Sequence, residues 1–183
     1  MSATARVQRS FRRGFATYDD SALVQKAIAR GLIRRLLRHA ADTRLTRVFE
    51  AGYGTGQLTR LMLQRLPIET LHLNDLAAPP LPFAPQADYR PGDIETLALP
   101  PDLDLVISAS MIQWIADPQG LIQRLCEAVR PGGWLALSGF GPDHFPELQA
   151  LGSQAAAPSL LSAAAMASLL ASGWTVQESG SGL

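Results

Sequence analysis

The sequence predicts a doubly wound α/β fold, with a mostly parallel sheet and helices on both faces. Short apolar runs alternate with segments of helical periodicity, and the first of these runs leads into a glycine-rich turn. The 183 residues are enough for one domain with its own hydrophobic core. In such sheets ligands bind at the carboxyl ends of the strands, near the point where the strand order reverses. The residues that directly follow each strand are therefore the first candidates for a functional site.

The same patterns place the elements along the chain. Helices are expected at 19–38, 56–66, 120–129 and 159–173, and strands at 47–52, 70–75, 87–90, 103–108, 134–140 and 174–179. Four prolines between residues 76 and 86 forbid a regular helix there. The Pro131-Gly132-Gly133 sequence is expected to end the helix over 120–129. We expect six strands at most, with an unusual edge.

The composition excludes several classes of protein. Apolar residues make up 47% and charged residues 17%, as in a soluble globular protein. Cys126 is the single cysteine, so no intramolecular disulfide can form, and no Cys/His spacing suggests a metal site. No stretch approaches the ~20 apolar residues of a membrane helix, and the start of the chain lacks the apolar core of a secretory signal. We therefore expect a cytoplasmic protein without a membrane partner.

The charges are distributed unevenly. Residues 1–47 contain eleven lysines and arginines but three acidic residues, a net charge of +8, and the remainder of the chain carries −8. A basic N-terminal part can steer an acidic partner toward the protein. A solvated helix face is the alternative interpretation. No nucleic-acid partner is expected, because no DNA-binding motif or aromatic platform accompanies the charge.

A glycine-rich turn follows the first predicted strand. Glu50 ends that strand, and Gly52, Gly54 and Gly56 stand at alternate positions after it. Such glycines let the backbone turn tightly and let a ligand approach it closely. The dinucleotide fingerprint needs its third glycine at the position of Gln57, so a nicotinamide cofactor is disfavoured. A turn that serves only strand–helix packing is the alternative.

Carboxylates follow the second and third predicted strands. Asp75 lies nineteen residues after Gly56, where a carboxylate can accept hydrogen bonds from the hydroxyls of a ribose. Asp93 can accept from an exocyclic amine, and the neighbouring Ile94 can lie against a flat base. Taken singly, Asp75 also fits a helix cap or turn, and Asp93 is a weak signal. The glycine turn, Asp75 and Asp93 in this order are far more specific.

These motifs resemble those of class I S-adenosylmethionine-dependent methyltransferases. Within that superfamily the chain is similar to the malonyl-[acyl-carrier protein] O-methyltransferases of biotin synthesis, from about Phe11 to about Leu151. The glycine turn and Asp75 carry the broader resemblance. The narrower one rests on three further stretches: TYD…VQ near the start, Ile-Gln-Trp after the fourth strand and GP…PEL after the fifth.

The resemblance implies a Rossmann-like fold, S-adenosylmethionine as cofactor and a set of site residues. The glycines would line the methionine part of the cofactor with Glu50 behind them, Asp75 would hold the ribose, and Asp93 and Ile94 the adenine. Each of these residues, and the Gln113-Trp114 pair, also has a purely structural interpretation. The full set of cofactor-binding residues is Tyr18, Glu50, Gly52, Gly54, Gly56, Asp75, Leu76, Asp93, Ile94, Ser108, Ala109 and Ser110, with Tyr18 in an N-terminal lid and Ser108 to Ser110 beneath the sulfonium.

The implied reaction methylates the free carboxyl of a malonyl thioester, on an acyl-carrier protein or coenzyme A. A malonyl carboxylate is ionised at pH 7, so no general base is required. Arginine forks suit a carboxylate, and the candidates for substrate binding are Arg12, Arg13, Arg90 and His144; His144 is equally well interpreted as a surface residue. The Asn/Asp-Pro-Pro-Tyr stretch of amine-methylating relatives is absent.

The chain departs from the family in two places. The proline-rich 76–86 segment replaces a helix, so the adenine side should be walled differently. The part after the fifth strand is short, which predicts a more open acceptor site and a sheet edge that a homodimer or protein partner would cover. We therefore expect one methyltransferase domain over 1–183, with a basic lid or helix at 1–40, a cofactor-binding core at 47–140 and a shortened part at 141–183. Another small-molecule methyltransferase, or a non-catalytic protein that binds a cofactor or a partner, are the alternative functions.

Overall fold

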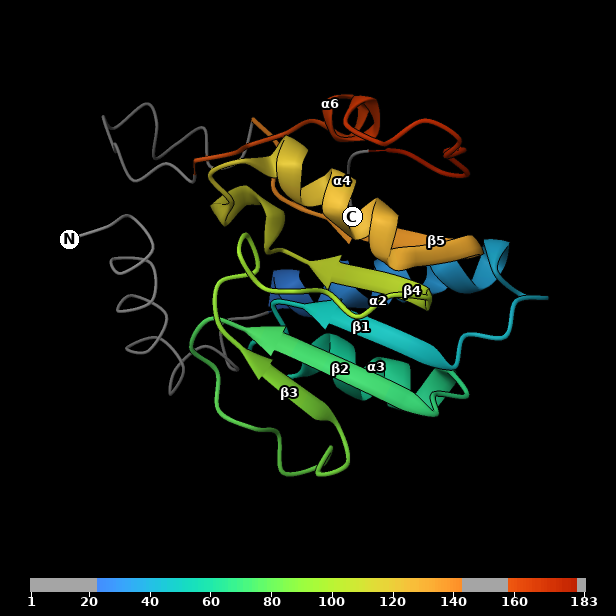
Figure 1. Ribbon diagram of the computed structural model, residues 1–183, viewed down its shortest axis with the longest axis vertical. Helices are drawn as coiled ribbons and strands as arrows, with labels where there is room; N and C mark the ends of the chain where they lie inside the picture. The colour runs from blue at the N-terminus through green and yellow to red at the C-terminus, as the bar shows by residue number, and fades with distance from the viewer. Residues whose placement is uncertain (1–22, 143–157, 181–183) are drawn as a thin grey trace.

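A five-stranded parallel sheet forms the centre of the molecule (Figure 1). The computed structural model describes residues 23–142 and 158–180. The strands lie in the order β3-β2-β1-β4-β5, and every pair is parallel. Their bounds are β1 (Arg47–Ala51), β2 (Thr70–Asp75), β3 (Asp88–Pro91), β4 (Leu103–Ala109) and β5 (Val129–Ser138). The predicted fold class is confirmed.

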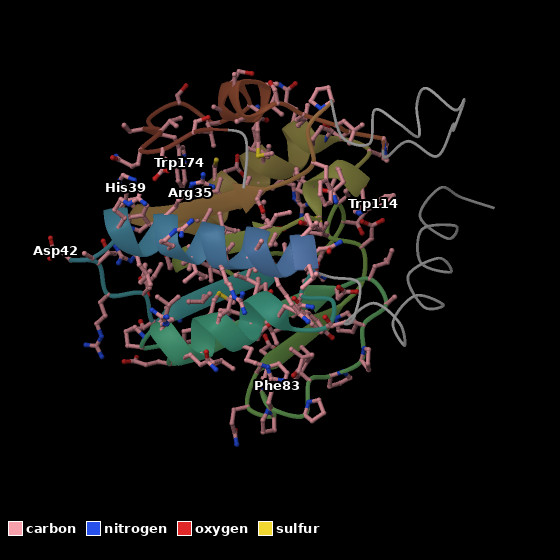
Figure 2. The ribbon with its side chains drawn as sticks, turned by 180° about the vertical axis from the view of Figure 1, so that it is seen from behind. Arg35, His39, Asp42, Phe83, Trp114 and Trp174 are labelled. Atoms are coloured by element: carbon pink, nitrogen blue, oxygen red, sulfur yellow. The ribbon has the colours of Figure 1, made fainter. Side chains whose placement is uncertain are left out.

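Helices cover both faces of the sheet. Figure 2 shows α2 (Leu23–His39) and α3 (Gln57–Arg65) on one face. On the other lies α4 (Pro118–Ala128), with the short α6 (Ala163–Ser168) beyond it, and the 3-10 turn η1 (Ile112–Trp114) follows β4 (Figure 1). The buried residues of α2 recur three and four positions apart, which gives the helix one apolar stripe: Ala29, Leu32, Ile33 and Leu36.

Each face of the sheet has its own hydrophobic core. In β1, Val48 points into the core beneath α2 and α3, whereas its neighbour Phe49 points into the core beneath α4. Both side chains are fully buried. A strand covered on both faces must be apolar along its whole length, and this explains the continuous apolar runs in the sequence.

The strand order reverses beside β1. From β1 the chain builds β2 and then β3 outward on one side, and it then returns to add β4 and β5 on the other side. The loops after β1 and β4 therefore diverge at this switch point, which is where ligands bind in open parallel sheets. The predicted site residues follow these strands, and the fold brings their ends to one edge.

Two predictions at the C-terminal side of the sheet were wrong. The strand expected at 174–179 does not form, and the helix expected at 159–173 is reduced to α6. Instead of pairing with β5, Trp174 packs into the core on the α4 side, and Glu178 bonds to Arg35 and His39 of α2 on the opposite face. The described sheet has five strands, one fewer than the six allowed.

The Pro131-Gly132-Gly133 sequence was predicted to separate α4 from a later strand, and this prediction was wrong. The strand β5 already begins at Val129, directly after α4. Between Leu103 and Leu105 of β4 the partner strand advances from Val129 to Trp134, so the extra residues form a bulge within β5. None of the helices within 23–142 and 158–180 has the length and apolar character required to span a bilayer.

Candidate functional site

Neighbouring side chains pack against two glycines of the turn, Gly52 and Gly56, and the space beside Gly54 is open. Gly52, Gly54 and Gly56 all adopt positive φ angles, of 73°, 52° and 78°. A Cβ on Gly52 would lie 2.6 Å from Cγ of Met111, and one on Gly56 would lie 2.6 Å from Cδ1 of Leu81. A Cβ on Gly54 would meet nothing within 4 Å. The turn therefore presents bare backbone at Gly54, where a ligand can approach.

The Asp75 carboxylate lies directly beside this open position. Its Oδ2 accepts a 2.9 Å hydrogen bond from the backbone N–H of Gly54, and its Oδ1 accepts from the N–H groups of Ala77 and Ala78. Asp75 therefore does act as a turn residue, because its carboxylate accepts these three backbone hydrogen bonds. A carboxylate offers about four acceptor positions, so about one remains for a ligand hydroxyl.

Asn74 connects the loops that follow three neighbouring strands. Its carbonyl oxygen accepts from the N–H groups of Gly52 and Tyr53, at 2.8 and 3.1 Å. Its side-chain Nδ2 donates to the carbonyl oxygens of Arg90 and Gly92. The side chain is 2% exposed, and its amide is satisfied only where these loops meet. The sequence analysis did not single it out, although a polar residue next to Asp75 in a buried strand was a usable signal.

Glu50 lies buried beneath the glycine turn. It is 1% exposed, and its Oε2 accepts a 2.6 Å hydrogen bond from the hydroxyl of Thr59 on α3. Burial raises the pKa of Glu50 from 4.5 to about 8, the Thr59 hydrogen bond opposes the rise, and the charge of Asp75 adds to it. A protonated Glu50 at neutral pH ties β1 to α3 without an unpaired buried charge. The place of Glu50 behind a cofactor-binding turn stays a prediction.

Two tyrosines hold the proline-rich 76–86 segment against the glycine turn. The Tyr53 hydroxyl donates to the carbonyl oxygens of Ala78 and Pro79. The Tyr89 hydroxyl accepts from the N–H of Leu81. The two rings meet edge to face, with centroids 5.8 Å apart. As predicted, no helix forms in this segment; both tyrosines were missed by the sequence analysis.

The loop after β3 leaves Asp93 half-buried and places Ile94 in the core. The Asp93 Oδ1 accepts from the N–H of Glu95 and closes a tight turn. Ile94 is 5% exposed and packs in the core beneath α4. The Arg124 guanidinium of α4 donates to the carbonyl oxygens of Ile94 and Glu95, which fixes the loop. The adenine role of Asp93 and Ile94 stays a prediction.

The ends of β4 and β5 form the other half of the site. The hydroxyl of Ser108 donates a 2.8 Å hydrogen bond to the carbonyl oxygen of Ala51, which fixes the end of β1 to β4. Ser110 has a left-handed φ of 57°, unusual for a residue with a side chain, and its N–H donates to the carbonyl oxygen of Ser138. Gln113 is 2% exposed and donates from Nε2 to the carbonyl oxygen of Ser110.

The remaining predicted residues are placed elsewhere or lie outside the described part of the chain. The latter group comprises Arg12, Arg13, Tyr18 and His144. Arg90 lies on the outermost strand β3, where it pairs with Asp88 at 2.7 Å, away from β4 and β5. Leu76 and Ala109 are half-buried at the ends of β2 and β4. Within 23–142 and 158–180, no three His, Cys, Asp or Glu side chains gather as metal ligands.

Comparison with known proteins connects this arrangement to one family. Residues 49–137 match the family model described as a methyltransferase domain. Among curated proteins, the chain is 34% identical over 157 residues to a malonyl-[acyl-carrier protein] O-methyltransferase of Prosthecochloris aestuarii, with 80% of this chain and 59% of that protein covered. A protein of the same name from Acinetobacter baylyi is 34% identical over 153 residues, with 81% and 59% covered.

Solved structures share the fold. The 1,6-didemethyltoxoflavin-N1-methyltransferase of Burkholderia thailandensis superposes with a TM-score of 0.60 at 19% identity, over 79% of this chain and 67% of that one. An amino pentose methyltransferase from Micromonospora echinaspora gives 0.55 at 22% identity, over 71% and 57%. The chain spans about three fifths of the length of the curated relatives that it matches. The solved structures confirm the predicted Rossmann-like fold, and residues 49–137 are similar to a methyltransferase domain.

Proposed function

We propose that the chain is a class I S-adenosylmethionine-dependent methyltransferase, and that it methylates the free carboxyl of a malonyl thioester as a step of biotin synthesis. The similarity to a methyltransferase domain and to malonyl-[acyl-carrier protein] O-methyltransferases supports the proposal. The observation that carries the proposal is the glycine turn, open only at Gly54 and flanked there by the Asp75 carboxylate. The names of the curated relatives supply the acceptor, the malonyl group of an acyl-carrier protein.

The cofactor would lie across the ends of β1, β2 and β3. Asp75 would accept from a ribose hydroxyl, and the backbone at Gly54 would contact the methionine part. Asp93 would bond to the adenine amine, and Leu76 and the edge of Ile94 would flank the base. Ser108 to Ser110, at the end of β4, would pass beneath the sulfonium. The ends of β4 and β5 beyond them are left for the acceptor, on the opposite side of the switch point.

The residues of the chain have to position the reactants and exclude water. Bound in this site, S-adenosylmethionine supplies an electrophilic methyl group. The acceptor carboxylate is already ionised at pH 7, so no side chain has to remove a proton. Opposite charges on the two reactants cancel in the transition state, and alignment in a dry site therefore provides most of the rate acceleration. The proposed contacts to the carboxylate are Arg12, Arg13 and His144, because Arg90 lies on the edge strand β3, away from the ends of β4 and β5.

A methyl-transfer assay tests the proposal. The purified chain is incubated with S-adenosylmethionine labelled in its methyl group and with malonyl-acyl-carrier protein, malonyl-coenzyme A or acetyl-coenzyme A. We expect a methyl ester on the malonyl thioesters and none on the acetyl thioester, which lacks the free carboxyl. The Asp75→Ala variant should lose this activity, whereas Ser168→Ala, on the exposed helix α6, should keep it. Binding of the cofactor without transfer to any malonyl thioester would contradict the proposed acceptor.

A further inference from the structure

Three buried oxygen atoms at the ends of β4 and β5 have no hydrogen-bond partner among the described residues. They are Oγ of Ser110, Oε1 of Gln113 and Oγ of Ser138; we call them the oxygen cluster. An unpaired polar atom away from water costs free energy, and native structures rarely leave several together without a ligand or a water to satisfy them.

Backbone and side-chain hydrogen bonds hold the three residues of the oxygen cluster together. The Ser110 N–H donates to the carbonyl oxygen of Ser138 at 3.0 Å. The Gln113 Nε2 donates to the carbonyl oxygen of Ser110 at 2.7 Å. This second bond uses the amide nitrogen of Gln113, so the atom left without a partner is its carbonyl oxygen.

Gly139 packs against Ile112 and lies beside the oxygen cluster. A Cβ at this position would lie 2.4 Å from Cγ2 of Ile112 and 3.4 Å from Oε1 of Gln113. Gly139 is itself half-buried, as are Ser110 and Ser138, whereas Gln113 is 2% exposed. A side chain at position 139 would therefore overlap Ile112 and crowd the Gln113 oxygen.

The chemistry of the oxygen cluster indicates the group that would satisfy it. The carbonyl oxygen of Gln113 can only accept, so its partner must donate; an ionised carboxylate offers no donor. The two serine hydroxyls can donate to a carbonyl oxygen. An amide, with one N–H and one C=O, complements this set.

We propose that the oxygen cluster binds an amide group in the arm of the acceptor thioester, beside the group that is methylated. The inference rests on the proposed function, which assigns the ends of β4 and β5 to the acceptor. Acyl-carrier protein and coenzyme A both hold their thioesters through an amide-bearing pantetheine arm. The oxygen cluster would thus select the arm, whereas other residues bind the malonyl carboxylate.

The test compares two thioesters on two variants. Malonyl-pantetheine carries the amides, and the malonyl thioester of butanethiol has none. Ser138→Ala removes one unpaired hydroxyl, so its melting temperature should equal or exceed that of the wild type. We expect its KM for malonyl-pantetheine to rise about tenfold, the equivalent of one hydrogen bond, with an unchanged KM for the butanethiol thioester. Gln113→Met should also raise the KM for malonyl-pantetheine. Ser168→Ala is the matched control and should leave both KM values unchanged.

Each alternative outcome has its own signature. An equal loss on both thioesters would reduce the oxygen cluster to a structural role, and weaker binding of S-adenosylhomocysteine would assign it to the cofactor; either result overturns the inference, as does an unchanged KM. If the wild type methylates neither thioester, the proposed function fails. Calorimetric titration of the S-adenosylhomocysteine-bound protein with pantetheine then decides: about tenfold weaker binding by Ser138→Ala supports the inference, and equal or absent binding overturns it.

Discussion

At the scale of single residues, the glycines of the turn have different tasks. Gly52 faces Met111 and Gly56 faces Leu81, so the absence of their side chains serves packing. Gly54 faces open space beside Asp75, so the absence of its side chain serves a ligand. The sequence pattern identified all three glycines but could not separate these tasks, because the neighbours at Gly52 and Gly56 come from other parts of the chain.

Alanine substitutions separate the two tasks. Gly54→Ala introduces strain at a positive φ but no overlap, so it should lower the free energy of unfolding by about 1–2 kcal/mol and weaken S-adenosylhomocysteine binding at least tenfold. Gly52→Ala adds an overlap with Met111, and should destabilise by about 2–4 kcal/mol. Urea unfolding and calorimetric titration measure the two effects. Unchanged ligand affinity in Gly54→Ala would place the ligand elsewhere.

Glu50 should make stability depend on pH. Its folded-state pKa is raised to about 8 by burial, whereas in the unfolded chain it stays near 4.5. The folded protein therefore retains a proton that the unfolded chain has released, so the contribution of Glu50 is fully present below pH 4.5 and is lost as the pH rises through about 8. The variant Glu50→Gln stays neutral and should show a flatter fall of unfolding free energy between pH 5.5 and 8.5. Parallel pH profiles for the two proteins would refute a raised pKa.

At the scale of elements, Asp104 joins three strands at the end of the sheet opposite the glycine turn. Its Oδ2 accepts from the N–H groups of Thr46 and Arg47, which lead into β1, and its Oδ1 accepts from Nε of Arg130 in β5 at 2.6 Å. Burial opposes the charge of Asp104, but these hydrogen bonds outweigh it and lower the pKa to about 2.

Asp104→Asn should therefore destabilise the sheet without affecting the site. We expect a loss of about 1–2 kcal/mol in the free energy of unfolding, because the half-exposed Arg130 guanidinium loses a charged partner, and an unchanged affinity for S-adenosylhomocysteine. The depressed pKa means that the wild type keeps this stability above pH 3.8 and loses it as the pH falls through about 2. Denaturant unfolding at pH 7 and pH 3 measures both. A loss of ligand affinity equal to the loss of stability would show that the two ends are coupled.

The elements that sequence reasoning placed correctly are those with long, regular patterns. The strands β1, β2 and β4 are buried on both faces, and their apolar runs mark them clearly. The wrong predictions concern segments whose structure depends on contacts with residues far away in the sequence. Pro131 and the glycines after it are compatible with a break, yet pairing with β4 draws them into a bulge of β5. Residues 174–179 have the composition of a strand. Trp174 packs into the core instead, and Glu178 bonds to Arg35 of α2.

At the scale of the whole molecule, charge should govern the encounter with the proposed carrier protein. The helix α2 alone carries Lys26, Arg30, Arg34, Arg35 and Arg38, and acyl-carrier proteins are acidic. Raising the salt concentration from 50 to 500 mM should increase the KM for malonyl-acyl-carrier protein several-fold, because surface charges are screened. The KM for malonyl-pantetheine, which lacks the carrier, should change little. An equal salt effect on both acceptors would exclude steering by the basic surface.

The candidate site was predicted less completely than the fold. The three glycines follow β1, Glu50 lies within β1 and Asp75 ends β2, so their places follow from the strand positions. Asn74 and Thr59 act through contacts with other elements, β3 and β1, which a single sequence does not reveal. Gln113 bonds to the irregular backbone at Ser110, which the sequence pattern did not predict.

Calorimetric titration of the purified chain with S-adenosylhomocysteine tests the central claim most directly, because it requires no knowledge of the acceptor. We expect one binding site per chain, with binding abolished in Asp75→Ala and retained in Ser168→Ala. A well-folded wild-type chain that binds no S-adenosylhomocysteine would contradict the assignment of the turn at Gly54 and Asp75 as a cofactor site.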